Sequence, residues 1–400
     1  CSGALREDID PIIKNLGIAD AFSVIVTAED TPKSKPNPAP YALTIKKLGI
    51  DDPATAIAIE DTPAGILSAK GAGLKVLAVT NSYDRPIATP VESLRPAQQT
   101  CEQCHWPSQF YGRKLITQHY YRSDEPNSAW TVSLAVNVGG GEGTPDAGSD
   151  GIHFHMLAGK TIEYLAVDDK RQVIPWVRVT RDDGTVSVFS DPNIPYPDPD
   201  ESETEVRTFD CVDCHNRPSH QFLPPAVAVN EAMAIGSISR DLPFVRRNGL
   251  ELLNAPYETH EEAEETIRSA LTAFYWETYP DRADALSGEI ERAADTLVDI
   301  YAHNFFPEMK TDYRAHLNNL SHFVNEGCFR CHGSDKVDEA GNTITKECNA
   351  CHTIVAQGPS DSLDDLDQDL TGLEFVHPVD IGTTWQEINC TGCHTPEEGY

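Results

Sequence analysis

The feature that most constrains this sequence is a five-residue pattern, Cys-x-x-Cys-His, which occurs five times between residues 101 and 394. Ten of the eleven cysteines belong to these motifs, and only Cys1 is left over. The motif cysteines are Cys101, Cys104, Cys211, Cys214, Cys328, Cys331, Cys348, Cys351, Cys390 and Cys393, and the histidines that follow them are His105, His215, His332, His352 and His394. This regular association of two thiols with one imidazole predicts one kind of site, repeated five times.

Each motif has the chemistry of covalent haem attachment. Two thiols three positions apart lie on one side of a single turn, so each can add to a vinyl group of the same haem, and the next histidine can ligate the iron. A disulfide framework does not need a histidine after every second cysteine. Zinc sites combine two cysteine pairs, or one pair with separated histidines, so five pairs would leave one over. We therefore expect five haems c.

A haem that only carries electrons is expected to have a second axial ligand. The preferred candidates are His119, His153, His155, His220, His322 and His377. On a strand, His153 and His155 would face the same way, and we expect one of them to be a ligand. The weaker candidates are His303, His316, Met156 and Met309. His260 lies in a glutamate-rich stretch and is expected to face solvent.

The chain carries 63 acidic and 31 basic side chains, a net charge of −32. This charge would repel a phosphate backbone, so we expect no nucleic-acid partner. No stretch approaches the roughly 18 apolar residues of a membrane-spanning helix, and no signal peptide is visible. The first residue is Cys1 rather than methionine, so we expect a processed chain or a fragment.

Helical and strand patterns alternate through residues 1–80, which is typical of a parallel α/β sheet. Helices are expected at Ala4–Gly17, Pro40–Leu48 and Pro63–Ala72, and strands at Phe22–Thr27, Thr55–Ile59 and Leu74–Thr80. Residues 81–100 contain Pro86, Pro90 and Pro96 and are expected to form a linker.

Residues 101–400 are expected to form one pentahaem domain. It would contain a β-rich insert at residues 127–190 and a helical part at residues 225–306. The insert is predicted to have strands at Ala129–Val138, Ile162–Val167, Val173–Val179 and Thr185–Phe189. Two helices, broken near Pro280, are expected in Glu261–Phe306. The predicted fold class is mixed: a partial Rossmann-like α/β piece, then a cytochrome region of strands, helices and haem-organised loops.

Several segments around the motifs carry a resemblance to a known family. They are Arg85–Pro90, Leu94–Pro96, Cys101–Pro107, Gly151–Met156, Gln172–Val177, Cys214–Pro218, Phe306–Met309, Gly327–His332 and His377–Asp380. From about residue 85 onward the chain resembles the C-terminal part of the NapC/NirT-type multihaem cytochromes c. The resemblance implies periplasm-facing electron transfer, commonly from membrane quinol. Family members usually begin with a membrane helix and further haem motifs, which this sequence does not show.

Residues 1–80 resemble a different family, the haloacid-dehalogenase-like hydrolases of the β-phosphoglucomutase-like kind. The matching segments are Ser2–Arg6, Lys35–Pro38 and Glu60–Gly65. The resemblance implies that Ser2 and Lys35 hold a phosphoryl group and that Glu60 and Asp61 hold Mg²⁺, a cation that prefers carboxylate ligands. The nucleophilic aspartate motif that precedes Ser2 in that family is absent, so no phosphoenzyme is expected.

The two resemblances imply different compartments. Hydrolases of this kind are cytoplasmic, whereas haem c is attached outside the cytoplasmic membrane. This difference predicts a seam near residues 73–85, either a genuine fusion or an artificial join of two coding sequences. The alternative to a phosphoryl site is that Lys35, Glu60 and Asp61 are surface charges on a truncated domain.

The sequence therefore favours an electron carrier with five covalent haems on the periplasmic side of a membrane. A quinol-linked membrane donor and a redox protein are the expected partners. One alternative is a multihaem reductase, which would need one haem with an open site. Another is a phosphatase, which would need the missing nucleophile.

The spacing of the motifs predicts which haems are neighbours. His332 and Cys348 are 16 residues apart, so the third and fourth haems should lie in near contact. The first haem is expected to be separated from the second by the β-rich insert. Haem propionates would add negative charge, and their expected partners are Arg217, Arg330 and Lys336.

We predict five covalently bound haems per chain. Pyridine haemochrome quantification on protein matured by a c-type haem attachment system should give five equivalents. Replacing both Cys348 and Cys351 with alanine should reduce this to four, because one pair of thioether bonds is lost. Haem that is extracted without cleaving thioether bonds, or zinc in its place, would contradict the assignment.

Overall fold

The computed structural model describes residues 1–78, 90, 97–103, 105, 112–139, 151–156, 160–201, 204–217, 220–363, 365–367 and 371–396. The chain forms two compact units, Cys1–Asp84 and Arg85–Tyr400. The boundary falls inside the stretch predicted to be a linker, most of which lies outside the described residues.

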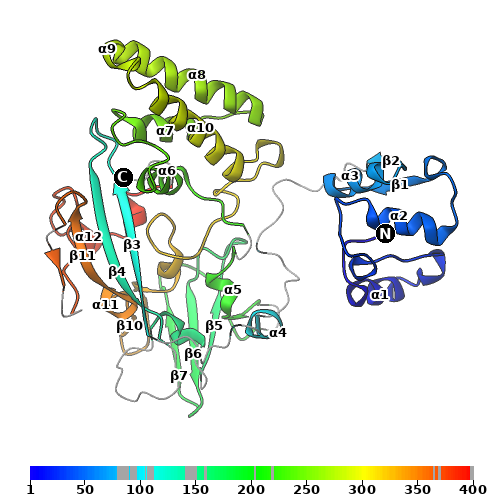
Figure 1. The fold of residues 1–400 in the computed structure, drawn as a ribbon. Coiled ribbons are helices and arrows are strands. Elements are labelled where there is room, and N and C mark those ends of the chain that lie inside the picture. Colours follow the sequence, from blue (N-terminus) through cyan, green and yellow to red (C-terminus); the bar gives the residue numbers. More distant parts are fainter. Residues whose placement is uncertain are drawn as a thin grey trace. The chain divides into compact units, whose positions relative to one another are not determined.

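The N-terminal unit contains a small parallel α/β arrangement. Its helices are α1 (Arg6–Asn15), α2 (Ala39–Leu48) and α3 (Pro63–Gly71), and its strands are β1 (Ile57–Glu60) and β2 (Lys75–Ala78). The strands β1 and β2 pair in parallel, with α3 as the connection between them (Figure 1). Tyr41, Ala58 and Ala69 form a small buried core. The alternation predicted from the sequence is therefore present at these elements.

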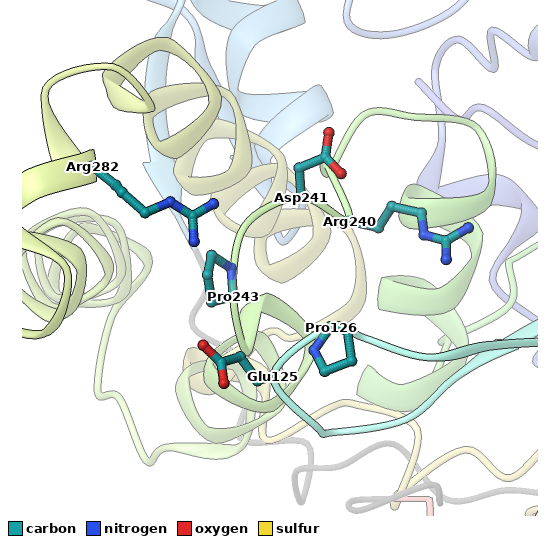
Figure 2. A pocket seen from close by; sticks show the side chains of 6 residues that line it. All are labelled: Glu125, Pro126, Arg240, Asp241, Pro243 and Arg282. Carbon is teal, nitrogen blue, oxygen red and sulfur yellow. The ribbon is translucent and has the colours of Figure 1, made fainter.

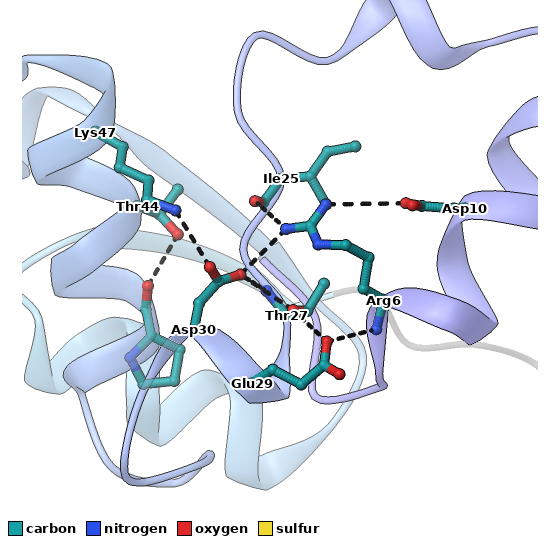
Figure 3. A network of polar contacts seen from close by, with 9 residues as sticks. Arg6, Asp10, Ile25, Thr27, Glu29, Asp30, Thr44 and Lys47 are labelled. Atoms are coloured by element: carbon teal, nitrogen blue, oxygen red, sulfur yellow. Dashed lines mark hydrogen bonds and ion pairs between the residues drawn. The ribbon is translucent and has the colours of Figure 1, made fainter.

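The strand predicted at Phe22–Thr27 is wrong. Val26 is buried, but its carbonyl oxygen accepts a hydrogen bond from the Ser2 amide at 2.9 Å, and this segment is not part of a sheet. The chain then turns at Asp30, whose carboxylate accepts hydrogen bonds from the Thr27 amide and hydroxyl and from Arg6 (Figure 3). The bonds from Thr27 lower the pKa of Asp30 to about 2. Side-chain bonding at this turn has replaced a ladder of strand hydrogen bonds.

The C-terminal unit contains two antiparallel sheets. One has the strand order β12-β11-β4-β3 and consists of β3 (Arg113–Tyr121), β4 (Ala129–Asn137), β11 (His352–Pro359) and β12 (Asp365–Leu366). The other has the order β10-β9-β7-β6-β5-β8 and consists of β5 (Lys160–Leu165), β6 (Trp176–Arg181), β7 (Val186–Ser190), β8 (Arg207–Thr208), β9 (Gly333–Val337) and β10 (Thr343–Ile344).

These sheets change the interpretation of residues 127–190. The four predicted strands are present, but β4 belongs to one sheet and β5, β6 and β7 belong to the other. β3 was not predicted, and β11 joins β4 from more than two hundred residues away. The β-rich segment is therefore not an independent insert, because strands near the third and fourth motifs complete both of its sheets.

Five helices cover residues 225–304. They are α6 (Pro225–Ala234), α7 (Val245–Asn254), α8 (His260–Thr278), α9 (Pro280–Ala283) and α10 (Ser287–Asn304). Figure 1 shows them together at one end of the unit. The predicted break near Pro280 is confirmed, because α8 ends at Thr278 and the short α9 begins at Pro280. Ile267, Leu271 and Leu297 are fully buried in their shared core.

A buried arginine joins these helices to the turn between β3 and β4. Arg246 on α7 is fully buried and donates hydrogen bonds to Asn230 on α6 and to Ser123 at the end of β3. Asn127 in the turn accepts a hydrogen bond from the Arg246 amide and donates to the Leu242 carbonyl. These contacts fix the helical part against the four-stranded sheet.

The remaining helices are short. They are α4 (Ala97–Thr100), α5 (Cys211–Cys214), α11 (Cys348–Cys351) and α12 (Thr384–Glu387). Within the described ranges, none of the helices has the length and apolar character needed to span a membrane.

We predict that the Leu271→Ala substitution in α8 destabilises the helical part by about 2–5 kcal/mol, because it opens a cavity in a fully buried core. Ile235→Ala is the matched control, since the Ile235 side chain is 79% exposed. Thermal unfolding followed by circular dichroism should show a lower transition for Leu271→Ala only. Equal effects of the two substitutions would contradict this packing.

Candidate haem-attachment sites

The same backbone hydrogen bond occurs in all five motifs. The amide of the motif histidine donates to the carbonyl of the first cysteine, at 2.8 Å in the first, second and fifth motifs and 3.0 Å in the third. The fourth motif has this bond from His352 to Cys348. Each motif is therefore one helical or 3-10 turn that ends at its histidine. Cys104 lies outside the described residues, so this geometry is incomplete for the first motif.

Local sequence explains why the second motif turns at this point. Asp210 caps α5 by accepting a hydrogen bond from the Val212 amide, and the Asp213 carboxylate accepts one from the Asp210 amide. This reciprocal arrangement is a capping box. Tyr164 and Arg207 also donate to Asp213, at 2.6 and 2.8 Å, so this buried carboxylate is fully engaged.

The motif thiols are available for covalent attachment. None of the described cysteines forms a disulfide. Burial raises the pKa of the Cys214 thiol to about 12 and that of Cys331 to about 11. The described part of the chain contains no converging group of three metal-binding side chains.

Four motif histidines face a second histidine ring. A bond from a metal to an imidazole nitrogen is about 2 Å long, and the nitrogen lies about 1 Å from its ring centre, so rings that ligate one metal from opposite sides have centres roughly 6 Å apart. His215 and His153 have ring centres 6.5 Å apart and planes 9° apart. His352 and His322 have values of 6.1 Å and 15°.

The other two pairs are similar in separation. The ring centres of His332 and His155 are 5.7 Å apart with an interplanar angle of 87°, and those of His394 and His377 are 5.8 Å apart with an angle of 32°. A hollow of about 430 Å³ lies beside His377 and extends along residues 374–385. The ring separations in all four pairs fit one metal ion between two imidazoles.

Hydrogen bonds at Nδ1 orient several of these rings. His153, His155 and His332 each place Nδ1 within 2.6–3.1 Å of a backbone carbonyl. Because a carbonyl only accepts, Nδ1 carries the hydrogen and the Nε2 lone pair remains for a metal, an arrangement typical of metal-ligating histidines.

Burial keeps these imidazoles in the neutral form that binds metals. It lowers the pKa of His155 to about 4 and also lowers the pKa values of His322, His332 and His352. The buried Nδ1 atoms of His322 and His352 have no hydrogen-bond partner. These four histidines are therefore better suited to bind a haem iron than to act as protonated surface residues.

The expectation that His153 and His155 lie on a strand is wrong. They lie on a 3-10 turn, Ile152–Met156, whose shorter repeat sends the two rings to different motif histidines. The rings of the predicted ligand candidates His322 and His377 each lie opposite a motif histidine, His352 and His394 respectively.

The other candidate histidines have different surroundings. His119 lies on β3, exposed, with Nδ1 2.9 Å from the Thr131 hydroxyl. The His220 ring packs against Phe222 at 4.4 Å, and His316 stacks on the same phenylalanine at 5.1 Å. His105 is among the described residues, but residues 106–111 beside it are not. No histidine is therefore assigned opposite His105.

His260 and His303 are exposed, as expected for weak candidates. The Nε2 atom of His260 lies 2.7 Å from the Phe305 carbonyl, and Nδ1 of His303 lies 2.8 Å from the Asp299 carbonyl. The nitrogen of His260 that would bind iron is thus already used.

Neighbouring motifs are joined by specific contacts. Phe329 of the third motif stacks on His322, with their ring centres 4.3 Å apart. The His322 ring in turn faces His352 of the fourth motif. Phe323 stacks on His394 of the fifth motif at 5.0 Å. The third and fourth sites are therefore close, as the spacing predicted.

The predicted separation of the first and second sites is wrong. The Ala97 amide, at the start of α4, hydrogen-bonds to the Asp210 carboxylate that caps the turn of the second motif. The segment that leads into the first motif therefore contacts the second.

The expected propionate partners Arg217, Arg330 and Lys336 all make hydrogen bonds within the protein. Lys336 is buried and bonds to Asp335 at 2.7 Å, and Arg217 donates to the Leu317 carbonyl at 3.3 Å. Arg330 is also buried, and its hydrogen bonds go to backbone carbonyls.

In residues 1–78, the side chains that the hydrolase resemblance assigns to a phosphoryl group and Mg²⁺ bond within the protein. Lys35 and Tyr41 both hydrogen-bond to the Glu60 carboxylate. Burial alone would raise the pKa of Glu60, but these two hydrogen bonds outweigh it and lower the pKa. The Ser2 hydroxyl accepts from the Ala4 amide. Glu60 is thus neutralised by Lys35 rather than directed with Asp61 at a cation.

A second hollow, of about 570 Å³, lies where the β3–β4 turn meets the helices (Figure 2). It is lined by Glu125, Pro126, Arg240, Asp241, Pro243 and Arg282. Arg240 is engaged by both oxygens of Asp361 at 3.0 Å. With no motif residue in its lining, this hollow is separate from the attachment sites.

Comparisons with known proteins find two similarities in this chain. Residues 1–79 match the family model of haloacid dehalogenase-like hydrolases. A stretch of 69 residues is 45% identical to the putative phosphatase YhcW of Bacillus subtilis and covers 17% of this chain and 31% of the relative. The N-terminal unit is therefore similar to part of a hydrolase.

Most of the chain is similar to a c-type cytochrome. Over 331 residues, 82% of this chain, it is 38% identical to the cytochrome c-type protein ImcH of Geobacter sulfurreducens. The chain spans 64% of that relative's length and about a third of the lengths of the phosphatases. No solved structure matches the chain.

We predict that this chain has no Mg²⁺-dependent phosphatase activity, because the Glu60 carboxylate is engaged by Lys35 and Tyr41 instead of being open to a cation. Hydrolysis of an aryl phosphate should be the same with Mg²⁺ or EDTA, and Asp61→Ala should not change it. Turnover that requires Mg²⁺ and is lost in Asp61→Ala would contradict this.

Proposed function

We propose that the C-terminal unit transfers electrons through five covalently bound haems c. The observation that carries this proposal is the set of four histidine pairs, each with one member from a Cys-x-x-Cys-His motif and ring centres 5.7–6.5 Å apart. Similarity to a cytochrome c-type protein over most of the chain supports it.

The proposed axial ligands follow from the pairs. They are His215 with His153, His332 with His155, His352 with His322, and His394 with His377. His105 would ligate the first haem, with a second ligand from His119, His220 or His316. When bound, each haem supplies one-electron chemistry.

The chain's own residues prepare these sites. The shared turn presents two thiols and a histidine, and the Nδ1–carbonyl bonds hold the opposing rings with Nε2 directed away from the backbone. In the four paired sites, two protein ligands per iron leave no open position, which favours electron transfer over substrate binding there.

We propose further that the protein is of the NapC/NirT type and works on the periplasmic side of a membrane. Its partners would be a quinol-linked membrane donor and a redox protein as acceptor. The resemblance of residues 85–400 to that family supports this proposal, as does haem c attachment outside the cytoplasmic membrane.

Removing one opposing histidine tests the assignment. In His322→Ala, one haem in five should become high-spin, because His322 lies opposite His352. His303→Ala is the matched control, since His303 is exposed on α10 and bonds to its own helix. Electron paramagnetic resonance and visible absorption of the haem-loaded protein measure the spin state.

An unchanged spectrum in His322→Ala would contradict the proposed pair. A high-spin haem already present in the unmutated protein would favour the reductase alternative, because it would reveal an open site. The His303→Ala variant should remain low-spin to the same extent as the parent.

A further inference from the structure

Arg330 occupies an unusual position inside the third motif, between Phe329 and Cys331. It is only 6% exposed. Its Nε, Nη1 and Nη2 atoms donate to the carbonyl oxygens of Gly327 at 2.9 Å, Arg171 at 2.8 Å and Asp213 at 2.7 Å. A buried guanidinium is normally paired with a carboxylate. Arg330 instead donates to three backbone carbonyls, which suggests a specific role for it.

The hydrogen bond from Arg330 to the Asp213 carbonyl connects the second and third attachment sites. Asp213 lies between Cys211 and Cys214, so the guanidinium of the third motif holds the backbone of the second. Asn319 donates to the same carbonyl at 3.0 Å. The two sites are joined a second time through the 3-10 turn Ile152–Met156, which supplies the rings opposite His215 and His332.

The charge of Arg330 is not cancelled by an ion pair. In the described part of the chain, no salt bridge joins it to a carboxylate. The carboxylate of Asp213, whose backbone carbonyl accepts from Arg330, is engaged by Arg207 and Tyr164. Arg330 therefore leaves a net positive charge inside the protein.

The position of this charge relates it to both motifs. Arg330 lies between the two cysteines of the third motif, and its Nη2 atom donates to the carbonyl of Asp213, the residue before Cys214. The guanidinium is therefore adjacent to attachment residues of the second and third sites.

We propose that Arg330 is a positioning residue that joins the second and third haem sites and raises the reduction potentials of both. The inference rests on the proposed function. Reduction adds an electron to a site, so a nearby fixed positive charge favours the reduced form. Because Arg330 is buried, salt screens this effect much less than it would screen a surface charge.

The test compares Arg330→Gln, which removes the charge, with Arg330→Lys, which keeps it. Potentiometric titration of the full haem-loaded chain should show two of five midpoint potentials shifted downward in Arg330→Gln. Arg330→Lys should restore them most of the way towards the parent values. Arg292→Gln is the matched control, since Arg292 is 63% exposed, and it should leave all five potentials unchanged.

A second measurement covers the case in which Arg330→Gln matures poorly. Mass spectrometry of proteolytic haem peptides reports attachment at each motif separately. Loss of haem from the second and third motifs alone supports the bridging role of Arg330, whereas equal loss from all five overturns it.

The outcomes separate this inference from the function on which it rests. If the parent protein binds five low-spin haems and Arg330→Gln leaves every potential unchanged, the role of Arg330 is wrong and the function stands. If the parent binds no covalent haem, the proposed function itself fails.

Discussion

The hydrogen bond from each motif histidine to the carbonyl of its first cysteine is the constraint on which the C-terminal unit depends. It closes the same single turn five times, in three 3-10 and two α-helical variants. Once the turn is closed, the positions of the two thiols and the histidine relative to each other are fixed. At four motifs the rest of the fold places a second histidine ring opposite the motif histidine, from a 3-10 turn or from a loop.

One short segment contacts two of these sites and begins a third motif. Within residues 321–330, the His322 ring lies opposite His352 of the fourth motif, and Phe329 stacks on His322. Phe323 stacks on His394 of the fifth motif. Glu326 in the same segment accepts hydrogen bonds from Asn389 and Thr391 beside the fifth motif. Gly327 has a positive φ of 46°, and a Cβ there would collide with the Ser321 carbonyl, so only glycine allows the segment to fold back.

Local pattern and long-range pairing differ in how well they can be predicted. The five turns, the α/β alternation at β1, α3 and β2, and the helix break at Pro280 all depend on residues close in sequence, and the sequence predicted them. The pairing of β11 with β4 depends on contacts between residues 352–359 and 130–136, which no local pattern encodes. His153 and His155 show the same limit, since alternating residues suit a strand until tertiary contacts with His215 and His332 favour a 3-10 turn.

The placement of cations inside this acidic chain follows from its overall charge. A net charge of −32 produces a negative field, and such a field offsets part of the cost of burying a guanidinium or an ammonium. Arg246, Arg330 and Lys336 are all buried in the C-terminal unit, although arginine and lysine are rarely so. Residues 353–400 contain no lysine or arginine at all, so the fifth motif lies in a purely acidic stretch of sequence. The charged surroundings of the motifs therefore differ along the chain, since Arg330 is buried within the third motif and the fifth lies among acidic residues. With haems bound as proposed, identical motifs would have different reduction potentials, because ligand identity is common to the sites and the surrounding charge is not.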